Sequence, residues 1–544
     1  MPLEATRFGD LPAFAAASWG ECEALRFGSA TMTFAGLNEQ IDRAAKALLA
    51  RGIRRGDTVG FWLTNGIEFI VGLYAAMRIG AVAAPMNTRY REHDVAYTLQ
   101  LSECKLLFVI GRSGQVAYLE MLKAVLPGFD GTGFHGAEGF PHLKDIVVIN
   151  DESEDKGLSW ERFLAGAEAV SAAELQEAAD HVREDDVALI IFTSGTTGKP
   201  KAVMQEHRLL RNIRERHESW PLRNGDTSLT FLPMFHAFGM AEQLVGSMIT
   251  GVRQIVMDSW DAERALDLIA EEGVNGLFGF ETHYADMLRA QERAPRDLSS
   301  LKFGALPAGM ANSNAVAAKV QKAMCPTVSG YGMSEIGCFV CASTLQDAEE
   351  QRSMTSGRPS RGLEVRIVQP DTGEDCPAGE AGEILCRGYT VMRGYFRDPE
   401  ATAKIIDADG WLHTGDRGLL REDGFLQLIG RYKEMLKVGG ENVSPAALEE
   451  ELSVLVPSIE QVAVIGVPHD RLVEVAAAYV VPRPGQTCSL EDVQARCKGK
   501  IASFKIPHHV FSVDSLPMTA SGKVQRTLLR ERAIGELAAA SACR

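Results

Sequence analysis

The 544-residue chain lacks any apolar run long enough to cross a membrane, since no stretch approaches the roughly 18 uninterrupted apolar residues that a spanning helix needs. Its N-terminal stretch, MPLEATRFGDLPAFAAASWG, has acidic residues early and no basic segment followed by a long apolar core, so it contains no recognisable secretory signal. The ten cysteines are scattered from Cys22 to Cys543, which is typical of reduced thiols. We therefore predict a cytoplasmic location and no transmembrane segment.

Long blocks of lysine or arginine are also missing, and the formal net charge is −16. Nucleic-acid binding depends on clustered cations, so nucleic acid is not an expected partner. A small anionic ligand is compatible with this charge, because a local pocket can be positive on an acidic protein. No second CxxC accompanies Cys338 and Cys341, so we expect buried thiols there rather than a metal or redox site.

The first part of the chain alternates apolar segments with helical and strand periodicity. The expected elements are helices at 37–50 and 69–77 and strands at 58–63 and 80–85. Repetition of this order predicts an α/β fold, with a parallel sheet that has helices on both faces. The glycine-rich stretch 111–143 is expected to be a surface excursion.

The character of the sequence changes near Leu428, and about 110 residues from there suffice for one small α/β domain. We place the boundary at 431–433, which gives an N-terminal region at 1–430 and a C-terminal domain at 434–544. The elements expected in this domain are helices at 446–456 and 490–500, strands at 461–467 and 474–481, and a tail that ends near Arg532.

A small basic loop, FTSGTTGKPK (Phe192–Lys201), directly follows the apolar strand expected at 187–192. It is not a Walker A loop, because its two glycines are only three residues apart and Pro200 stands where a hydroxyl should bind magnesium. Glycine amides, hydroxyl groups and lysine charges nevertheless suit phosphate. We interpret the segment as a phosphate-binding loop, with a flexible surface turn as the alternative.

The loop resembles the phosphate loop of the acyl-adenylate-forming (AMP-binding) enzymes, which comprise acyl-CoA synthetases, nonribosomal-peptide adenylation domains and beetle luciferases. Six more motifs resemble that family in its own order, so the resemblance covers nearly the whole chain and is most similar to the acyl-CoA synthetase branch. They are PMFHAFG (233–239), GALPAG (304–309), GYGMSE (330–335), GWLHTGD (410–416), GRYKEMLKVGGENVSP (430–445) and SGKVQR (521–526). The resemblance implies a large N-terminal region of layered α/β sheets and a small mobile C-terminal α/β lid, with the hinge 431–433 centred on Lys433.

The resemblance also implies a ligase that uses ATP, Mg²⁺ and coenzyme A. It would join a carboxylic acid to AMP and then transfer the acyl group to the thiol. The matching catalytic positions are Lys523, Glu335, Lys437 and His236. Lys523 would bridge the carboxylate and the α-phosphate, and Glu335 with Thr193 would hold Mg²⁺. His236 would shape the entrance rather than act as a base, because a carboxylate needs no deprotonation at pH 7.

A larger set of positions is expected to contact ATP or AMP. They are Thr193, Ser194, Gly195, Thr196, Thr197, Gly198, Lys199, Gly304, Ala305, Gly330, Tyr331, Gly332, Met333, Ser334, Asp416 and Arg431. Asp416 is acceptor-only and could take both ribose hydroxyls, although an Asx-turn is the alternative. Arg431 would add a fork of donors, with a surface ion pair as the alternative.

The thioester-forming face is expected to carry Lys437 and the pair Gly439 and Gly440, where two glycines would let the slender pantetheine of coenzyme A pass closely. An ordinary tight turn is the alternative.

By analogy, the acyl pocket is expected at Phe238, Met240, Cys338 and Phe339. These side chains are mostly apolar and favour a hydrophobic acid. An inward Phe339 would shorten the pocket and favour short-chain, medium-chain or small aromatic acids of fatty acid metabolism. Glu242 and Glu281 could meet a cationic acyl tail of the carnitine type, or could be solvated.

Three hypotheses compete at this point. The first is an acid–CoA ligase whose partners are a small carboxylic acid, ATP and coenzyme A, with a homodimer left open. The second keeps the adenylation chemistry but loads a carrier protein supplied in trans. The third is a non-enzymatic binder, which the presence of both Lys523 and Glu335 opposes.

Overall fold

The computed structural model describes residues 5–129, 134, 136–149, 158–194, 200–432, 435–517 and 524–542. The chain splits into two compact units. One consists of Met1–Thr88, Leu99–Phe192 and Ala202–Tyr432, and the other of Arg89–Thr98, Thr193–Lys201 and Lys433–Arg544. The domain assignment from sequence stays a prediction, because two short stretches from the N-terminal part group with the second unit.

The mixed α/β class is confirmed, and the largest sheet has eight strands in the order β20-β9-β8-β4-β3-β5-β6-β7. Its strands are β3 (Thr58–Trp62), β4 (Val82–Pro85), β5 (Leu106–Ile110), β6 (Asp145–Ile149), β7 (Leu158–Ser159), β8 (Val187–Ser194), β9 (Pro200–Glu206) and β20 (Gly394–Tyr395). The central strands pair in parallel, and β3 and β5 are buried along their whole length. Continuous apolar runs are typical of a parallel sheet covered on both faces.

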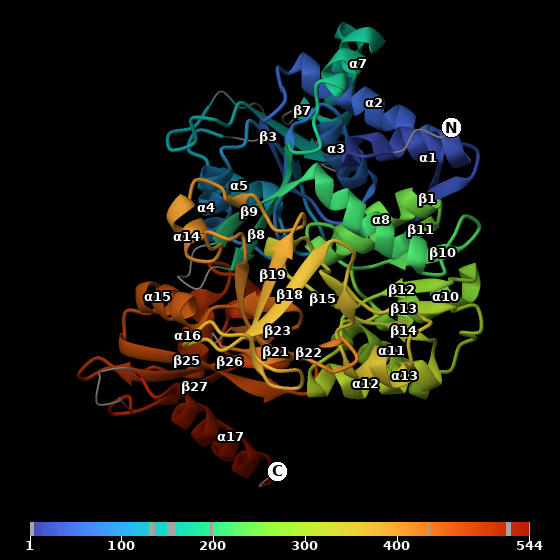
Figure 1. The fold of residues 1–544 in the computed structure, drawn as a ribbon. Helices are drawn as coiled ribbons and strands as arrows, with labels where there is room; N and C mark the ends of the chain where they lie inside the picture. The colour runs from blue at the N-terminus through green and yellow to red at the C-terminus, as the bar shows by residue number, and fades with distance from the viewer. Residues whose placement is uncertain are drawn as a thin grey trace. The chain divides into compact units, whose positions relative to one another are not determined.

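A second sheet has seven strands in the order β14-β13-β12-β10-β11-β1-β2 and is parallel except at the β1–β2 hairpin (Figure 1). Its strands are β1 (Glu23–Phe27), β2 (Ala30–Thr33), β10 (Thr227–Thr230), β11 (Arg253–Val256), β12 (Gly276–Phe278), β13 (Phe303–Ala305) and β14 (Thr327–Val328).

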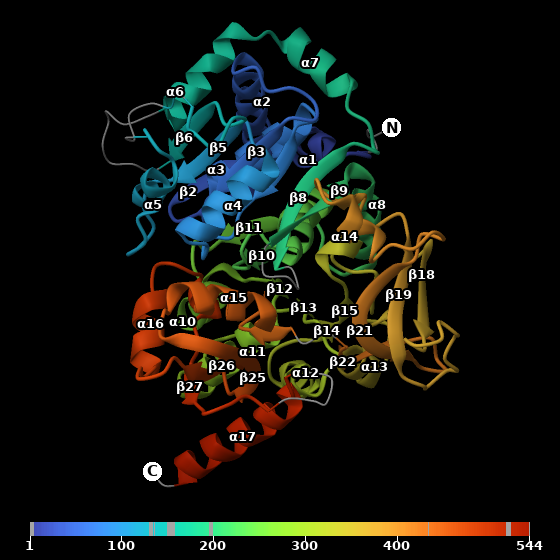
Figure 2. The same cartoon turned by 90° about the vertical axis from the view of Figure 1, so that its left-hand side faces the viewer.

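The helices before Tyr432 are α1 (Leu11–Trp19), α2 (Phe34–Ala50), α3 (Ile67–Arg78), α4 (Glu92–Ser102), α5 (Tyr118–Val125), α6 (Trp160–Ala165), α7 (Ala172–Asp180), α8 (Leu210–Ser219), α9 (Gly246–Thr250), α10 (Ala262–Glu272), α11 (Glu281–Arg293), α12 (Ala311–Ala323), α13 (Glu349–Met354) and α14 (Pro399–Ala403). Helix α2 illustrates why they form. Thr33 caps its first turn, and residues such as Ile41 and Leu48 bury one face. Helices α3, α6 and α7 pack on α2 (Figure 2).

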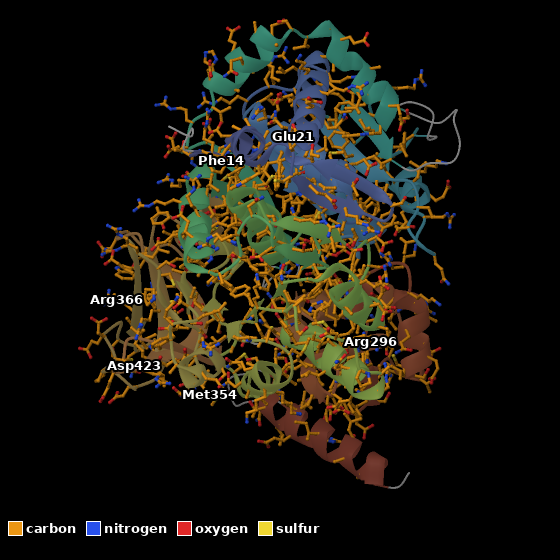
Figure 3. All side chains as sticks on the ribbon, turned by 90° about the vertical axis from the view of Figure 1, so that its right-hand side faces the viewer. Phe14, Glu21, Arg296, Met354, Arg366 and Asp423 are labelled. Atoms are coloured by element: carbon orange, nitrogen blue, oxygen red, sulfur yellow. The ribbon has the colours of Figure 1, made fainter. Side chains whose placement is uncertain are left out.

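Two smaller antiparallel sheets complete the first unit. One contains β15 (Gly330–Tyr331), β16 (Cys341–Ala342) and β17 (Arg358–Pro359), and the other contains β18 (Leu363–Val368), β19 (Gly382–Gly388), β21 (Leu412–Leu420) and β22 (Leu426–Arg431). Arg366 and Asp423 project outward from the four-stranded sheet (Figure 3). Its inner side chains, among them Ile384 and Leu412, are buried against Tyr331 and Ile336.

The second unit is built on a five-stranded sheet that is covered on both faces. Its elements are β23 (Leu436–Val438), β24 (Glu441–Val443), α15 (Pro445–Leu455), β25 (Ile459–His469), β26 (Val473–Pro482), α16 (Leu490–Cys497), β27 (His509–Ser512) and α17 (Arg526–Ala542). Along β25 and β26 alternate side chains separate into two clusters, one packed with α15 and α16 and the other with α17. Figure 1 shows α15 and α16 on one side of this sheet and α17 on the other. Period-two alternation is what a two-sided sheet requires.

Two expectations about local structure are wrong. The stretch 111–143 contains α5, and Tyr118, Leu119 and Leu122 of this helix are buried. The C-terminal tail continues as α17 well beyond Arg532, because Leu529 and Ala533 pack on the sheet. Both helices were missed because neighbouring glycines or a polar surface concealed their short apolar faces.

None of the helices in the described ranges is long and apolar enough to span a lipid bilayer.

A buried histidine next to β9 links the start of the chain to the eight-stranded sheet. The backbone N–H of Phe8 donates to His207 Nδ1 at 3.2 Å, so the neutral ring carries its own proton on Nε2. His207 is 0% exposed, and this burial lowers the pKa of its imidazole from 6.5 to about 4. Asp186 and Asp10 oppose the shift, and Arg7 reinforces it.

The buried ring should make stability depend on pH. The unfolded chain takes up a proton at His207 near pH 6.5, whereas the folded chain does so only near pH 4, so this contribution is complete above pH 6.5 and declines between these values as the pH falls. Across that interval the loss should be about 3 kcal/mol. Urea unfolding at several pH values should show a weaker acid dependence for His207→Asn, whose side-chain oxygen can still accept from Phe8. The exposed His181→Asn is the control, and identical profiles for both variants would contradict the assignment.

Candidate functional site

The predicted ribose acceptor lies in the four-stranded sheet and is held by a tyrosine from another sheet. Asp416 of β21 is 3% exposed, and Tyr331 Oη donates to its Oδ2 at 2.8 Å. Burial, with the Asp416 charge as a second cause, raises the pKa of Tyr331 well above its usual value, so the phenol stays a donor. The Thr414 hydroxyl accepts from the Asp416 backbone N–H at 3.0 Å. The structure thus joins two residues that the sequence placed in separate motifs.

Arg431 reaches the same place through the backbone. It ends β22 and pairs in register with Asp416 of β21. Its side chain is outside the described part, so its predicted role as a ribose or phosphate donor stays a prediction.

The predicted magnesium ligand, Glu335, is positioned by a second tyrosine. It is 7% exposed, and Tyr395 Oη donates to Glu335 Oε1 at 2.9 Å. The Met392 N–H donates to the Glu335 carbonyl at 2.8 Å, and Gln205 Nε2 donates to the Ser334 carbonyl at 2.7 Å. Tyr395 belongs to β20, which pairs with β9, so the strand after the predicted phosphate loop helps to place this glutamate.

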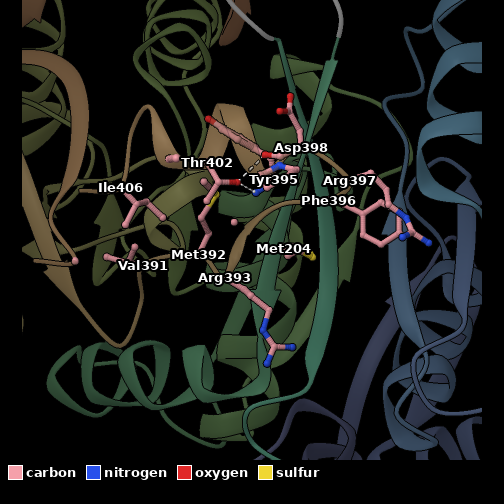
Figure 4. Close-up of a pocket in the computed structure, with 14 residues that line it drawn as sticks. Met204, Val391, Met392, Arg393, Tyr395, Phe396, Arg397, Asp398, Thr402 and Ile406 are labelled. Carbon is pink, nitrogen blue, oxygen red and sulfur yellow. Dashed lines mark hydrogen bonds between the residues drawn. The ribbon is translucent and has the colours of Figure 1, made fainter. Parts of the chain in front are cut away.

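Tyr395 also lines an open pocket of about 810 Å³ (Figure 4). The Tyr395 backbone N–H donates to Thr402 Oγ1 at 2.9 Å, which fixes the end of α14 against this strand. Arg393 and Arg397 at the rim are paired with Glu206 and Glu103. The pocket therefore lies beside Tyr395, the residue that holds Glu335, and both arginines that line it have a carboxylate partner.

The loop 304–309 approaches the same region from β13. The Ala308 N–H donates to Ser329 Oγ at 2.7 Å, one residue before β15 begins. Gly304 and Ala305 pair with β12 and β14, so the predicted adenine-side loop, the Gly330–Ser334 segment and Asp416 all belong to the first unit.

His236 and two of the predicted acyl-pocket residues, Phe238 and Phe339, form one aromatic group with Phe280. The His236 ring lies 6.1 Å from the Phe280 ring, measured between centroids, and Phe238 lies 5.1 Å from Phe280 and 5.2 Å from Phe339. Met240 and Phe339 are buried. The sequence missed Phe280, because it belongs to no motif and is brought in by the turn before α11.

Cys338 and Cys341 are both buried, and burial raises the pKa of each thiol well above its usual value. The prediction of buried thiols is confirmed. Among the described residues no group of three or more histidine, cysteine, aspartate or glutamate side chains could hold a metal ion.

Glu242, considered as a receptor for a cationic acyl tail or as a solvated side chain, is neither. It is 0% exposed, with Oε1 accepting from Arg216 and Oε2 lying 3.1 Å from His217 Nε2. Arg216 and His217 of α8 were missed, because nothing in the sequence spacing links α8 to Glu242. Glu281, the other candidate, begins α11.

In the second unit, Lys437 lies on β23 and pairs in register with Asn442 of β24. Gly439 and Gly440 form the two-residue turn between these strands, with φ angles of +57° and +90°. Two consecutive positive φ values match a type I′ hairpin, which explains the glycine pair by backbone geometry alone. The role of the pair toward coenzyme A stays a prediction.

Several predicted residues lie outside the described residues. They are Gly195, Thr196, Thr197, Gly198 and Lys199 of the phosphate loop, Lys433 of the hinge, and Lys523. Thr193 ends β8 together with Ser194, whose side chain is also outside.

Comparison with known proteins shows which family the sequence matches. A family model described as "AMP-binding enzyme" matches residues 12–396, and one described as "AMP-binding enzyme C-terminal domain" matches residues 449–523. The chain is 35% identical over 521 residues to the 3-[(3aS,4S,7aS)-7a-methyl-1,5-dioxo-octahydro-1H-inden-4-yl]propanoyl:CoA ligase of Rhodococcus jostii, covering 95% of this chain and 97% of that protein. It is 32% identical over 508 residues to the mitochondrial medium-chain acyl-CoA ligase ACSF2 of Danio rerio, covering 92% and 83%.

The solved structure of the anthranilate CoA ligase AuaEII in complex with anthranoyl-AMP is also similar. It has a TM-score of 0.70 and 26% sequence identity, and the match covers 99% of each chain.

The hydrogen bond between Tyr331 and Asp416 can be tested by removing one hydroxyl. Tyr331→Phe leaves a buried carboxylate without its phenol donor, so the free energy of unfolding should fall by about 1–3 kcal/mol and the affinity for AMP by about tenfold. Urea titration and calorimetric titration with AMP measure the two effects. In the matched control, Tyr74→Phe, the lost hydroxyl donates to the neutral Leu244 carbonyl at 3.5 Å, and the loss should stay below about 1 kcal/mol. Equal effects in both variants would show that the Asp416 contact is unimportant.

Proposed function

Because the chain belongs to the AMP-binding enzyme family, we propose that it is an ATP-dependent carboxylic acid–CoA ligase that works through an acyl-AMP intermediate. The observation that carries the proposal is the buried Asp416, which is oriented by Tyr331, in a unit that also positions Glu335. The relatives described above are CoA ligases by name, and one solved relative holds an acyl adenylate.

Two balanced steps make up the proposed reaction. A carboxylate oxygen attacks the α-phosphorus of ATP, the bond to the bridging oxygen breaks, and pyrophosphate leaves. The sulfur of coenzyme A then attacks the acyl carbonyl carbon, AMP leaves, and the thiol proton goes to solvent. Both reactants of the first step are anions, so cations must offset their repulsion, and Lys523 is the residue proposed for this role.

Mg²⁺ fits the donor chemistry of the chain. This ion usually keeps several waters and binds through one or two carboxylates together with substrate phosphates, so the single carboxylate of Glu335 suits it. Thr193 adds a hydroxyl oxygen of the same hard type. The ion would supply charge neutralisation at the phosphates, while Tyr395 keeps the Glu335 oxygens oriented.

The acyl group is proposed to be hydrophobic and of short or medium length, or a small aromatic ring. The buried rings of Phe238 and Phe339 and the thioether of Met240 support this, because they offer no charged partner to a second acid group. A carnitine-type acid is disfavoured, since the Glu242 carboxylate is already neutralised by Arg216.

Cytoplasmic location, a homodimer and a place in fatty acid metabolism remain predictions.

A panel of carboxylic acids, scored for pyrophosphate and AMP release with ATP and Mg²⁺, tests the proposal directly. Pyrophosphate release with at least one acid, followed by AMP release only when coenzyme A is added, is the expected result. An acyl carrier protein that outperforms coenzyme A at equal concentration would favour carrier loading instead. No release with any acid would refute the ligase assignment.

The two steps should separate by mutation. We expect Lys523→Ala to slow adenylation by about 10²–10³-fold, since one preorganised charge is lost, and to leave thioester formation from supplied acyl-AMP largely intact. Lys437→Ala and Gly440→Leu should have the opposite effect. Rapid-quench assays of each half-reaction measure both rates, and equal loss of both steps in every variant would contradict the division of labour.

A further inference from the structure

Helix α8 buries a polar face in the first unit, which calls for an explanation because helices normally bury apolar ones. Its buried residues include Asn212, Arg216 and His217. Arg216 is 3% exposed and pairs with the fully buried Glu242 of the π-helix η4 (Gly239–Val245). Removing two charges from water is expensive, so a buried ion pair is by itself weak support for stability.

Arg216 also holds the loop that follows Glu335. Its Nη1 donates to the Phe339 carbonyl at 3.1 Å, and its guanidinium carbon lies 5.6 Å from the centre of the Phe339 ring. Because Asn212 Oδ1 accepts from the same Nη1 and Glu242 Oε1 accepts from Nη2, the fork has one fixed orientation. One arginine therefore fixes both the backbone and the ring of Phe339.

The loop needs such support, because its backbone is strained. Cys338, immediately before Phe339, has a φ angle of +84°, which is unfavourable for a residue with a side chain. Its carbonyl oxygen lies so close to Gly332 that a Cβ there would come within 1.0 Å of it. Strain of this kind persists only when the surroundings over-determine the conformation, and it concentrates at functional sites.

Phe339 lies between Phe238, a predicted acyl-pocket residue, and Gly330 of the segment predicted to contact the nucleotide. Its ring lies 5.2 Å from that of Phe238, and it packs over the backbone of Gly330, next to Tyr331. Tyr331 in turn holds Asp416. A ring in this position can end an acyl pocket without displacing the nucleotide contacts.

We propose that Arg216, neutralised by Glu242 and oriented by Asn212, is a positioning residue that fixes Phe339 as the end wall of the acyl pocket and so limits the length of the acid. The inference rests on the proposed ligase function. On this proposal the site selects acids by chain length rather than by charge.

The experiment compares straight-chain acids that differ in length. For each acid, kcat/KM is measured by pyrophosphate release, and discrimination is the ratio between the best acid and one four carbons longer. The test variant is R216M/E242Q, which removes both charges together and so leaves no uncompensated buried ion. Discrimination should fall by about tenfold or more, because a few methylenes in an apolar pocket are worth at least that factor. The KM for ATP should stay within about twofold.

The matched control is Arg223→Met. Arg223 is an exposed arginine of the same region, and its Nη1 donates to the backbone carbonyls of His217 and Leu222 at 3.1 and 2.7 Å. This variant should keep the length profile of the wild type. A loss of kcat/KM that is equal for all acids in R216M/E242Q would mean a merely structural role and would overturn the inference.

Phe339→Ala tests whether the Phe339 ring forms the end wall of the acyl pocket, and it leaves the Arg216–Glu242 ion pair unchanged. This variant is the decisive test if R216M/E242Q does not fold. It should extend the profile to longer acids, and an unchanged profile would overturn the inference while leaving the ligase function intact. If none of the acids tested leads the wild type to release pyrophosphate, the proposed function fails and the inference fails with it.

Discussion

A carboxylate removed from water needs hydrogen-bond donors, and this requirement organises the centre of the first unit. Asp416, Glu335 and Glu242 are all nearly or fully buried. Each is held by a side chain from a distant part of the chain, so the smaller sheets, the π-helix and α8 cannot shift freely against one another. The contacts that satisfy these three groups are therefore also the contacts that assemble the site.

The chemical nature of the donor separates the three carboxylates by role. Tyrosines hold Asp416 and Glu335, and a neutral phenol donates its hydrogen bond without adding a positive charge. Asp416 is the acceptor proposed for the ribose hydroxyls, and Glu335 is the ligand proposed for the hard cation Mg²⁺. Glu242 instead faces Arg216, which cancels its charge, and the Glu242 pKa is lowered to about 2 despite the opposing effect of burial. Glu242 therefore has a structural role, which is to hold Arg216 in place.

Local patterns in the sequence predicted much of this molecule. Continuous apolar runs identified the parallel strands, and alternation in β25 and β26 matches two covered faces. The ordered motifs predicted site roles for Asp416 and Glu335, and the structure shows that both are buried and held by tyrosines. The donors Tyr395 and Arg216 could not be found in this way, because they lie 60 residues from Glu335 and 26 residues from Glu242, and only the sheet and helix packing brings them together. Short helices such as α5 were missed for a local reason, since glycines around them masked the periodicity.

The segment from Glu335 to Phe339 connects the contact made by Tyr395 with the contact made by Arg216. Tyr395 holds its first residue, Arg216 holds its last, and the strained Cys338 lies between them. A displacement of Phe339 by an acid that is too long would have to twist a backbone that is already fixed at both ends, and so would disturb the glutamate proposed to hold Mg²⁺. The length of the acid would then affect the position of the metal ligand Glu335, because a short strained loop transmits a shift at one end to the other.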